Sequence, residues 1–335
     1  MNKYNVCVVG IGAVGTEMVR LLEKRNFPMK SLTILARYQR VETIDGKNYP
    51  VEVATEEAFK GMDFAFFAGT EGAKGASKVF GFAAVKQGCL VIDNGDDFRM
   101  ESWVPLVIPE VNPGALKRQS GLIANPNCST IIALMALAPL YAENKIKRII
   151  ASTYQAVSGT GAKAVGELTK QATDWIRKKE ICCSVYPHQI LFNVIPAVGS
   201  FKDDSGESTE EIKMRSEIHK ILGDDSIRIS NTCVRVPVLN AHSISLNVEF
   251  ENPISPYEAR EILRRAPGVR VVDNVLADQY PMPIDASGIE EVLVGRIRKD
   301  QSVENGLALW CSGDNIWKGA ALNAIQIAEH LIQQK

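Results

Sequence analysis

Short apolar runs alternate with helical patterns over the first third of the chain. Residues 4–9 (YNVCVV) form a continuous apolar run that ends at a glycine, which is typical of a strand buried on both faces. A helical pattern over residues 16–24 and a second apolar run over residues 32–36 follow. Further strands are predicted at residues 63–69, 90–92, 104–108 and 121–124, with a helix at residues 76–87. This alternation predicts a mostly parallel, doubly wound α/β sheet.

The pattern changes after residue 128, where a long apolar helical stretch begins. Beyond it, the β-rich run at residues 148–154 and later runs predict strands with one exposed face. Ser255 and Glu258 form a capping box around Pro256, which marks the first turn of a helix. The other predicted elements are helices ending near residue 179 and at residues 209–222 and 318–334, and strands at residues 227–238, 243–250, 291–297 and 307–311. These elements predict a second domain of the α+β type.

Composition narrows the classes of function. The 335 residues carry a formal net charge of -1, so no basic field indicates nucleic acid or a membrane surface as a partner. The N-terminal apolar run is too short to span a bilayer, and no signal-peptide pattern follows it. Seven cysteines without a CxxC pair indicate reduced thiols in a cytoplasmic protein, with neither a zinc site nor a disulfide framework.

A glycine loop, GIGAVG, joins the first predicted strand to the first helix and contains Gly10, Gly12 and Gly15. In this context a GxGxxG loop lets the backbone approach a pyrophosphate, which then lies at the helix N-terminus. We therefore expect a dinucleotide cofactor at this loop. The alternative is a tight glycine-rich turn that binds nothing.

The residues after the second predicted strand bear on the choice of cofactor. NAD sites usually place an acidic side chain there to hold the ribose hydroxyl groups, but this chain has Arg37 and Arg40, and no carboxylate before Glu42. Two guanidinium groups suit a 2′-phosphate, so the sequence favours NADP. The alternative is that both arginines are solvated surface charges.

One cysteine, Cys128, lies where a predicted strand gives way to a helix, after the turn Asn125-Pro126-Asn127. Unpaired N–H groups and the helix dipole favour a thiolate at a helix start, and the thiolate is the reactive form of cysteine. The alternative is a small buried cysteine beside a helix cap at Ser129.

Polar residues in β-rich settings supply further candidates. Gln155 ends a β-rich run just before a second glycine turn that contains Ser158 and Gly159. Arg235 lies in another β-rich run, with His242 seven residues later. A buried arginine needs an acidic partner from the protein or from a ligand. The alternatives are an ordinary loop at the glycine turn and a satisfied loop or core histidine.

Two cations could bind an anion. Lys213 lies three residues after Glu210 on one face of a predicted helix, and Arg99 follows a strand in the segment DNGDDFRM. The alternatives are a solvated ion pair within the helix and a surface charge at Arg99.

Taken together, these motifs resemble the aspartate-β-semialdehyde dehydrogenase family. Six blocks carry the resemblance: NPNCST (125–130), VIPEVNP (107–113), TYQAVSGTG (153–161), STEEIK (208–213), RVPVLNAHS (235–243) and DNIWKGAALNAIQIAE (314–329). The resemblance implies a Rossmann-type NADP-binding domain at residues 1–127, completed by residues 316–335, and a catalytic and dimerisation domain at residues 128–315. It also implies a cytoplasmic homodimer that reduces β-aspartyl phosphate to aspartate semialdehyde in the biosynthesis of lysine, diaminopimelate, threonine, methionine and isoleucine.

The resemblance also implies roles for individual residues. Cys128 would be the nucleophile, Gln155 would orient the carbonyl, and His242 would be the acid/base that first helps to take the thiol proton. That role requires a histidine pKa near neutrality. Arg235, together with Glu210, would hold the amino-acid end of the substrate, while Arg99 and Lys213 would bind phosphate. The implied cofactor contacts are Gly10, Gly12, Ala13, Val14, Gly15, Arg37, Arg40, Ser158, Gly159 and Asn315.

The chain departs from the family's usual pattern at three places. GIGAVG is one residue shorter than the common GATGAVG, and Arg37 replaces the serine of LAS-x-RS. Where the family shows NSSAFR, this chain has NGDDFR at residues 94–99. Its Asp96 and Asp97 would repel an anionic ligand unless their carboxylates point away.

Two other functions compete with this interpretation. A sibling enzyme, such as an N-acetyl-γ-glutamyl-phosphate reductase, would act on another acyl phosphate or on an acyl-CoA, but its cysteine neighbourhood differs from NPNCST and NAHS. A non-catalytic paralogue would keep only the fold. The joint presence of Cys128, Gln155, Arg235 and His242 argues against the paralogue.

Overall fold

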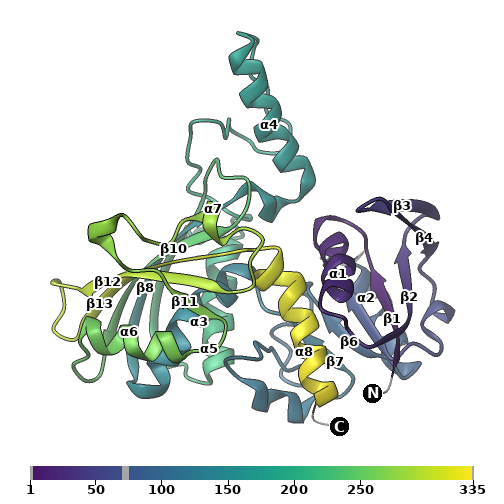
Figure 1. Ribbon diagram of the computed structural model, residues 1–335, viewed down its shortest axis with the longest axis horizontal. Helices are drawn as coiled ribbons and strands as arrows, with labels where there is room; N and C mark the ends of the chain where they lie inside the picture. The colour runs from purple at the N-terminus through teal and green to yellow at the C-terminus, as the bar shows by residue number, and fades with distance from the viewer. Residues whose placement is uncertain (1–2, 70–74, 334–335) are drawn as a thin grey trace. The chain divides into compact units, whose positions relative to one another are not determined.

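The computed structural model describes residues 3–69 and 75–333, which fold into two compact units. Unit 1 comprises residues 1–127 and 320–335, and unit 2 comprises residues 128–319. Each unit is built around one β-sheet, as Figure 1 shows.

The described part of unit 1 contains a seven-stranded sheet in the order β3-β4-β2-β1-β5-β6-β7. Its strands are β1 (Tyr4–Val9), β2 (Met29–Ala36), β3 (Arg40–Ile44), β4 (Lys47–Val53), β5 (Phe64–Phe67), β6 (Leu90–Asp93) and β7 (Leu122–Ala124). Neighbouring strands run parallel, except that β3 and β4 form an antiparallel hairpin. The predicted Rossmann-type sheet is confirmed, and burial of its central strands on both faces explains their continuous apolar runs.

Helices α1 (Ala13–Lys24), α2 (Ala76–Lys86) and α8 (Leu322–Gln333) belong to unit 1, with short 3-10 helices at Glu57–Phe59 and Pro113–Arg118. Polar contacts join the last helix of the chain to the rest of this unit. Arg25 forms an ion pair with Glu329 of α8 at 2.7 Å. Nδ2 of the buried Asn323 donates to Oδ1 of Asn125 at 2.6 Å. Residues near the two ends of the sequence therefore share one core.

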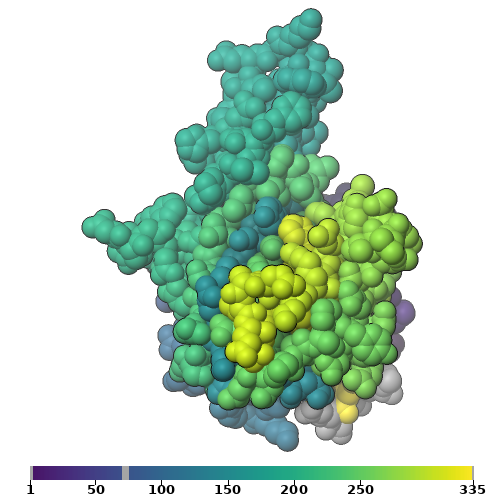
Figure 2. Space-filling view, turned by 90° about the vertical axis from the view of Figure 1, so that its left-hand side faces the viewer, coloured from purple at the N-terminus to yellow at the C-terminus, as the bar shows by residue number. Residues whose placement is uncertain are grey.

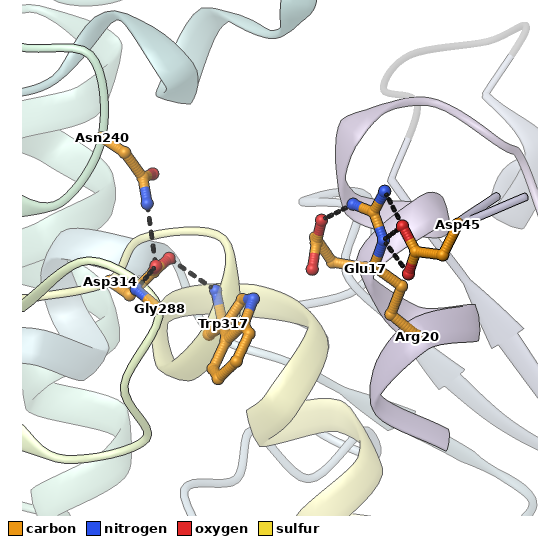
Figure 3. A network of polar contacts seen from close by, with 7 residues as sticks. All are labelled: Glu17, Arg20, Asp45, Asn240, Gly288, Asp314 and Trp317. Carbon is orange, nitrogen blue, oxygen red and sulfur yellow. Dashed lines mark hydrogen bonds and ion pairs between the residues drawn. The ribbon is translucent and has the colours of Figure 1, made fainter. Parts of the chain in front are cut away.

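The structure corrects the sequence prediction at two places in unit 1. The segment 104–108 is not a strand: Leu106 forms a single bridge with Ala124, and Pro105 has no N–H group with which to extend a ladder. The β3–β4 hairpin was missed. Its turn is bound to α1 because Arg20 pairs with both Glu17 and Asp45 (Figure 3).

The described part of unit 2 contains a six-stranded sheet in the order β11-β12-β13-β10-β8-β9. Its strands are β8 (Ile146–Gln155), β9 (Arg228–Arg235), β10 (His242–Phe250), β11 (Val269–Val271), β12 (Val292–Lys299) and β13 (Gly306–Gly313). β8 pairs with β9, and β11 with β12, in parallel, and the other pairs are antiparallel. The sheet is therefore mixed, and the predicted α+β type of the second domain is confirmed.

The helices of unit 2 differ in their burial. α3 (Cys128–Glu143) is apolar on every side and packs against α5 (Thr209–Leu222), α6 (Pro256–Arg265) and the sheet, as a fully buried helix does. Capping boxes begin both α5 and α6. Figures 1 and 2 show that α4 (Ala162–Ile176) extends away from the sheet of this unit.

The remaining elements of unit 2 are α7 (Pro283–Ala286), 3-10 helices at Val157–Thr160 and Val275–Ala277, and a π-helix at Trp317–Ala321 that leads into α8. None of the described helices is long and apolar enough to cross a bilayer.

Candidate active site

The nucleophile candidate Cys128 is the first residue of α3 and is half-buried. The positive end of the helix dipole at this helix start favours the thiolate. Other cysteines lie in a different environment: burial raises the pKa of Cys89 to about 11, and the pKa values of Cys233 and Cys311 to about 12. Those three thiols stay protonated at neutral pH. Cys128 differs from them because it is only half-buried and lies at a helix start.

Two parallel strands bring the polar candidates Gln155 and Arg235 side by side. Gln155 ends β8, and its Cα partner in the β8–β9 register is Arg235. Nε2 of Gln155 donates to Oε1 of Glu210 at 3.2 Å. All three side chains are buried. An amide, a carboxylate and a guanidinium therefore meet at one end of the unit 2 sheet, a set of groups that suits a zwitterionic ligand.

His242 begins β10 and has no exposed surface. Its Nδ1 accepts a hydrogen bond from the backbone N–H of Ala156 at 3.0 Å. Nη1 of Arg235 donates to the carbonyl oxygen of the same Ala156 at 2.7 Å. Burial, followed by the charge of Arg235, lowers the pKa of His242 well below its ordinary value. The direction of this shift differs from the expectation of a histidine pKa near neutrality, because burial and the charge of Arg235 arise only in the folded chain.

Gly159 marks the point where these groups converge. A Cβ atom on Gly159 would lie 2.9 Å from Nη1 of Arg235 and 3.1 Å from Nε2 of His242. Within the part of the chain that the structure describes, that Nε2 atom has no hydrogen-bond partner. The guanidinium of Arg235 and the imidazole of His242 thus pack closely against Gly159, where any larger residue would displace them.

Ser158, the residue before Gly159, lies beside Asn315. Oγ of Ser158 is 3.0 Å from the side-chain oxygens of both Asn240 and Asn315. Oδ1 of Asn315 also accepts from the N–H of Ala241 at 3.0 Å. Its Nδ2 atom is buried, and among the described residues it has no hydrogen-bond partner. The structure therefore brings together these two predicted cofactor contacts.

Asp314 holds three segments around the site, and sequence reasoning gave it no role. Its carboxylate accepts from Nδ2 of Asn240 and from the N–H of Gly288, each at 2.8 Å, and from the N–H of Trp317 at 2.9 Å (Figure 3). It therefore fixes the loop before His242 and the start of the π-helix. Asp314 begins the sequence block DNIWKGAA, which could have drawn attention to it. The sequence does not show, however, which residues its carboxylate contacts.

The glycine loop in unit 1 forms the expected tight turn. Gly10 has a φ of +94°, and a Cβ on Gly15 would lie 2.0 Å from the carbonyl oxygen of Gly10. Helix α1 begins at Ala13, so Ala13 and Val14 lie in its first turn. This close approach packs the start of α1 against the end of β1, and such a helix start is a site where a phosphate can bind.

The two arginines predicted to bind the cofactor are both exposed. Arg37 follows β2 and is exposed. Arg40 begins β3, where its Nε donates to Glu42 at 3.0 Å and its Nη1 to the carbonyl oxygen of Tyr38 at 3.4 Å. The charge of Arg40 is thus partly compensated within the strand.

The two predicted phosphate ligands lie in different units. Arg99 of unit 1 is buried and donates to the carbonyl oxygen of Asn94 at 2.7 Å. Lys213 of unit 2 is half-buried on α5, three residues after Glu210. No group of three or more histidine, cysteine or acidic side chains among the described residues is arranged to hold a metal ion.

Comparison with known proteins places these features in a family context. The model of the semialdehyde dehydrogenase NAD binding domain matches residues 5–119, and that of the semialdehyde dehydrogenase dimerisation domain matches residues 137–318. The chain is 48% identical to the aspartate-semialdehyde dehydrogenase of Aquifex aeolicus over 99% of this chain and 98% of the relative. It is 42% identical to that of Bacillus subtilis over 98% of this chain and 97% of the relative.

Solved structures agree with these matches. A crystal structure of aspartate semialdehyde dehydrogenase II from Vibrio cholerae superposes with a TM-score of 0.94 at 38% identity, and 99% of each chain is covered. A second structure of that protein is described as complexed with ASA and matches equally well.

Proposed function

The chain belongs to the aspartate-semialdehyde dehydrogenase family, and from this premise we propose that it reduces β-aspartyl phosphate to aspartate β-semialdehyde through a thioester on Cys128. The observation that carries the proposal is the convergence of Arg235 and His242 beside Gly159, in the same unit as Cys128. These are the residue types that such a substrate requires: a thiol, a carboxylate-binding fork and a donor to the carbonyl oxygen.

The substrate's amino-acid end would be bound by opposite charges. The guanidinium of Arg235 fits a carboxylate in two parallel hydrogen bonds. Glu210, which the Gln155 amide already contacts, carries the charge that suits an α-ammonium group. This pairing would orient the acyl carbon toward Cys128.

The chemistry proceeds through the Cys128 sulfur. Its thiolate attacks the acyl carbon, and the tetrahedral oxyanion collapses to a thioester as phosphate leaves. When bound, NADPH supplies the hydride that converts the thioester carbonyl into a hemithioacetal oxyanion. That oxyanion collapses to the aldehyde, and the C–S bond breaks to regenerate the thiolate. Sulfur suits both steps because a thiolate is a good nucleophile and a good leaving group.

Residues of unit 1 would bind the pyrophosphate and the adenosine 2′-phosphate of NADP. The α1 N-terminus and the Gly10 turn would hold the pyrophosphate, and the exposed Arg37 would bind the 2′-phosphate. Ser158, Gly159 and Asn315 of unit 2 would hold the nicotinamide end. Arg99 and Lys213 would bind the phosphate of the substrate.

We also propose that the enzyme is a cytoplasmic homodimer that serves the biosynthesis of lysine, diaminopimelate, threonine, methionine and isoleucine. The match to a dimerisation domain supports this assembly. So does an exposed apolar cluster at the end of α4, where Trp175 packs edge-on against Phe192 with ring centroids 5.0 Å apart. Exposed apolar clusters commonly mark protein interfaces.

A substrate comparison tests the proposal. The purified full-length protein would be assayed in the oxidative direction with phosphate and NADP, using either aspartate semialdehyde or N-acetylglutamate semialdehyde. We expect turnover to require phosphate and kcat/KM to favour aspartate semialdehyde by at least about 10³-fold, because an acylated amine leaves Glu210 without its partner charge. Preference for the acetylated substrate would instead identify a sibling reductase.

A further inference from the structure

We propose that Cys182 and Cys183 form an exposed vicinal dithiol that binds compounds of trivalent arsenic. The two cysteines lie in the irregular segment that follows α4 in unit 2. No step of the proposed reaction uses them, so the inference goes beyond the proposed function and does not depend on it.

The accessibility of these two thiols sets them apart from the other cysteines. Both are exposed, they are adjacent in the chain, and neither forms a disulfide. Cys128 is half-buried, and the remaining cysteines are buried: Cys7, Cys89, Cys233 and Cys311. A thiol reacts readily only where solvent reaches it. The pair is therefore the place where one reagent atom can contact two accessible sulfur atoms.

Two buried side chains of α4 hold the backbone on either side of Cys183. Nε2 of Gln171 donates to the carbonyl oxygen of Cys182 at 3.1 Å. Oε2 of Glu167 accepts from the N–H and from the hydroxyl group of Ser184, each at 2.7 Å. Both peptide groups that flank Cys183 are thus anchored to the helix. The dithiol is preorganised, so its binding of a ligand costs little conformational entropy.

The anchored backbone also disfavours a disulfide between the two cysteines. A disulfide requires sulfur atoms about 2.05 Å apart and Cα atoms usually at least about 4.4 Å apart. Consecutive Cα atoms across a trans peptide are only about 3.8 Å apart, so closing the bond would distort the loop. An arsenic atom lies between the two sulfur atoms and bonds to each, so they can stay further apart. The pair therefore remains reduced and available to arsenic.

A cation lies close to the pair. Lys170 of α4 interacts electrostatically with Cys182, although the pKa of Lys170 is raised mainly by its hydrogen bond with Asp174. A nearby ammonium group stabilises a thiolate, which is the nucleophilic form of cysteine. The surroundings of Cys182 thus favour attack on an electrophilic arsenic atom.

The binding reaction is a condensation that needs no oxidant or reductant. Arsenous acid carries three hydroxyl groups on trivalent arsenic. Each thiol forms an As–S bond, and its proton leaves as water with the hydroxyl group that the sulfur displaces. Two waters are released, the third hydroxyl group stays, and arsenic remains trivalent. Because the second As–S bond forms within one chain, the chelate is far more stable than two separate thiol adducts.

Intact-protein mass spectrometry with phenylarsine oxide tests the site. Two thiols condense with this probe and release one water, which leaves a phenylarsenic group bridging the sulfur atoms. The purified full-length protein would be treated with an equimolar amount of the probe in excess glutathione, a monothiol that competes for arsenic on single cysteines. We expect one phenylarsenic group on each chain, and its removal by the competing dithiol dithiothreitol. Wild-type protein that carries no adduct in glutathione would refute the proposal.

Single substitutions assign the adduct to its cysteines. Cys182→Ser and Cys183→Ser each leave one sulfur atom at an exposed position, where the exchange should not disturb folding. We expect each to weaken retention of the probe by at least about 10²-fold, the low end of the gain from a second linked bond. Cys128→Ala is the matched control and should keep the adduct. Full retention in either serine variant, or loss of the adduct in the Cys128 variant, would place arsenic elsewhere and overturn the proposal.

Discussion

Gly319 of the π-helix packs directly against Cys128. A Cβ atom on Gly319 would lie 2.8 Å from the Cβ of Cys128 and 3.3 Å from its Cα. Carbon atoms prefer separations of about 3.5–4.0 Å, so only glycine allows this approach. π-Helical turns occur frequently at functional sites. Here the turn sets the position of the proposed nucleophile.

Substitution of this glycine should therefore impair catalysis more than folding. We expect Gly319→Ala to lower kcat/KM by about 10²-fold, because a displacement of about 1 Å at a reacting atom has effects of that size. The matched control is Gly166→Ala, in the interior of α4, where a Cβ meets no atom within 4 Å. The control should keep its activity and gain up to about 1 kcal/mol in the free energy of unfolding. Equal activity in both variants would show that Cys128 tolerates the contact.

The thiol itself gives the second prediction. Cys128→Ala should abolish turnover while NADPH binding, followed by fluorescence titration, stays measurable. Because burial raises the pKa values of several other thiols, alkylation at neutral pH should be confined to Cys128 and the exposed Cys182 and Cys183. Cys182→Ala is the control and should remain active. Appreciable turnover by the Cys128 variant would remove it as the nucleophile.

Local signals predicted much of the fold. Helix α5 was predicted at its observed bounds, and the structure closes its two ends with a capping box at Ser208 and a left-handed Gly223. The β3–β4 hairpin was missed because its strands carry many polar residues and lack a continuous apolar run. Its Asp45-Gly46 turn was nevertheless a recognisable hairpin signal.

The site was less accessible to sequence reasoning. Family resemblance indicated which side chains belong to it, and the comparisons confirm the family. The backbone donor at Ala156 and the close approach of Gly319 could not be predicted, because neither depends on a chemically distinctive residue. The low pKa of His242 was missed for a related reason: burial and the distance to Arg235 exist only in the folded chain.

Arg235 provides the third prediction. Arg235→Lys should raise KM for aspartate semialdehyde by at least about tenfold, because an ammonium cannot reproduce the bidentate fork and cannot also hold the Ala156 carbonyl. The matched control on the same strand is Arg228→Lys, where an exposed side chain lies 3.5 Å from Glu249. Such surface pairs contribute little, so its kinetics should match the wild type. An unchanged KM for the Arg235 variant would exclude it from substrate binding.

Arg37 and Arg40 are both exposed after β2, and each should contribute to the choice of cofactor. Arg37→Ala should raise KM for NADPH by about 10–100-fold, the range expected for a lost charge-assisted hydrogen bond, and Arg40→Ala should raise it in the same direction. NADH has no 2′-phosphate and is the control, since its KM should change little in either variant. An unchanged KM for NADPH in both variants would exclude these arginines from binding the 2′-phosphate.

Asp93, at the end of β6, gives a prediction about the dependence of stability on pH. Burial raises its pKa to about 6, although it accepts from the N–H of Gly95 at 2.8 Å. A carboxyl with a raised pKa stabilises the fold fully below about pH 4, and this contribution is lost as the pH rises through about 6. Asp93→Asn is neutral at every pH and can still accept from Gly95. The free energy of unfolding of the variant minus that of the wild type should therefore increase by about 1–3 kcal/mol from pH 4.5 to pH 7. Urea denaturation of both proteins measures this difference. A difference between the two proteins that stays constant over this interval would show that Asp93 is charged throughout it.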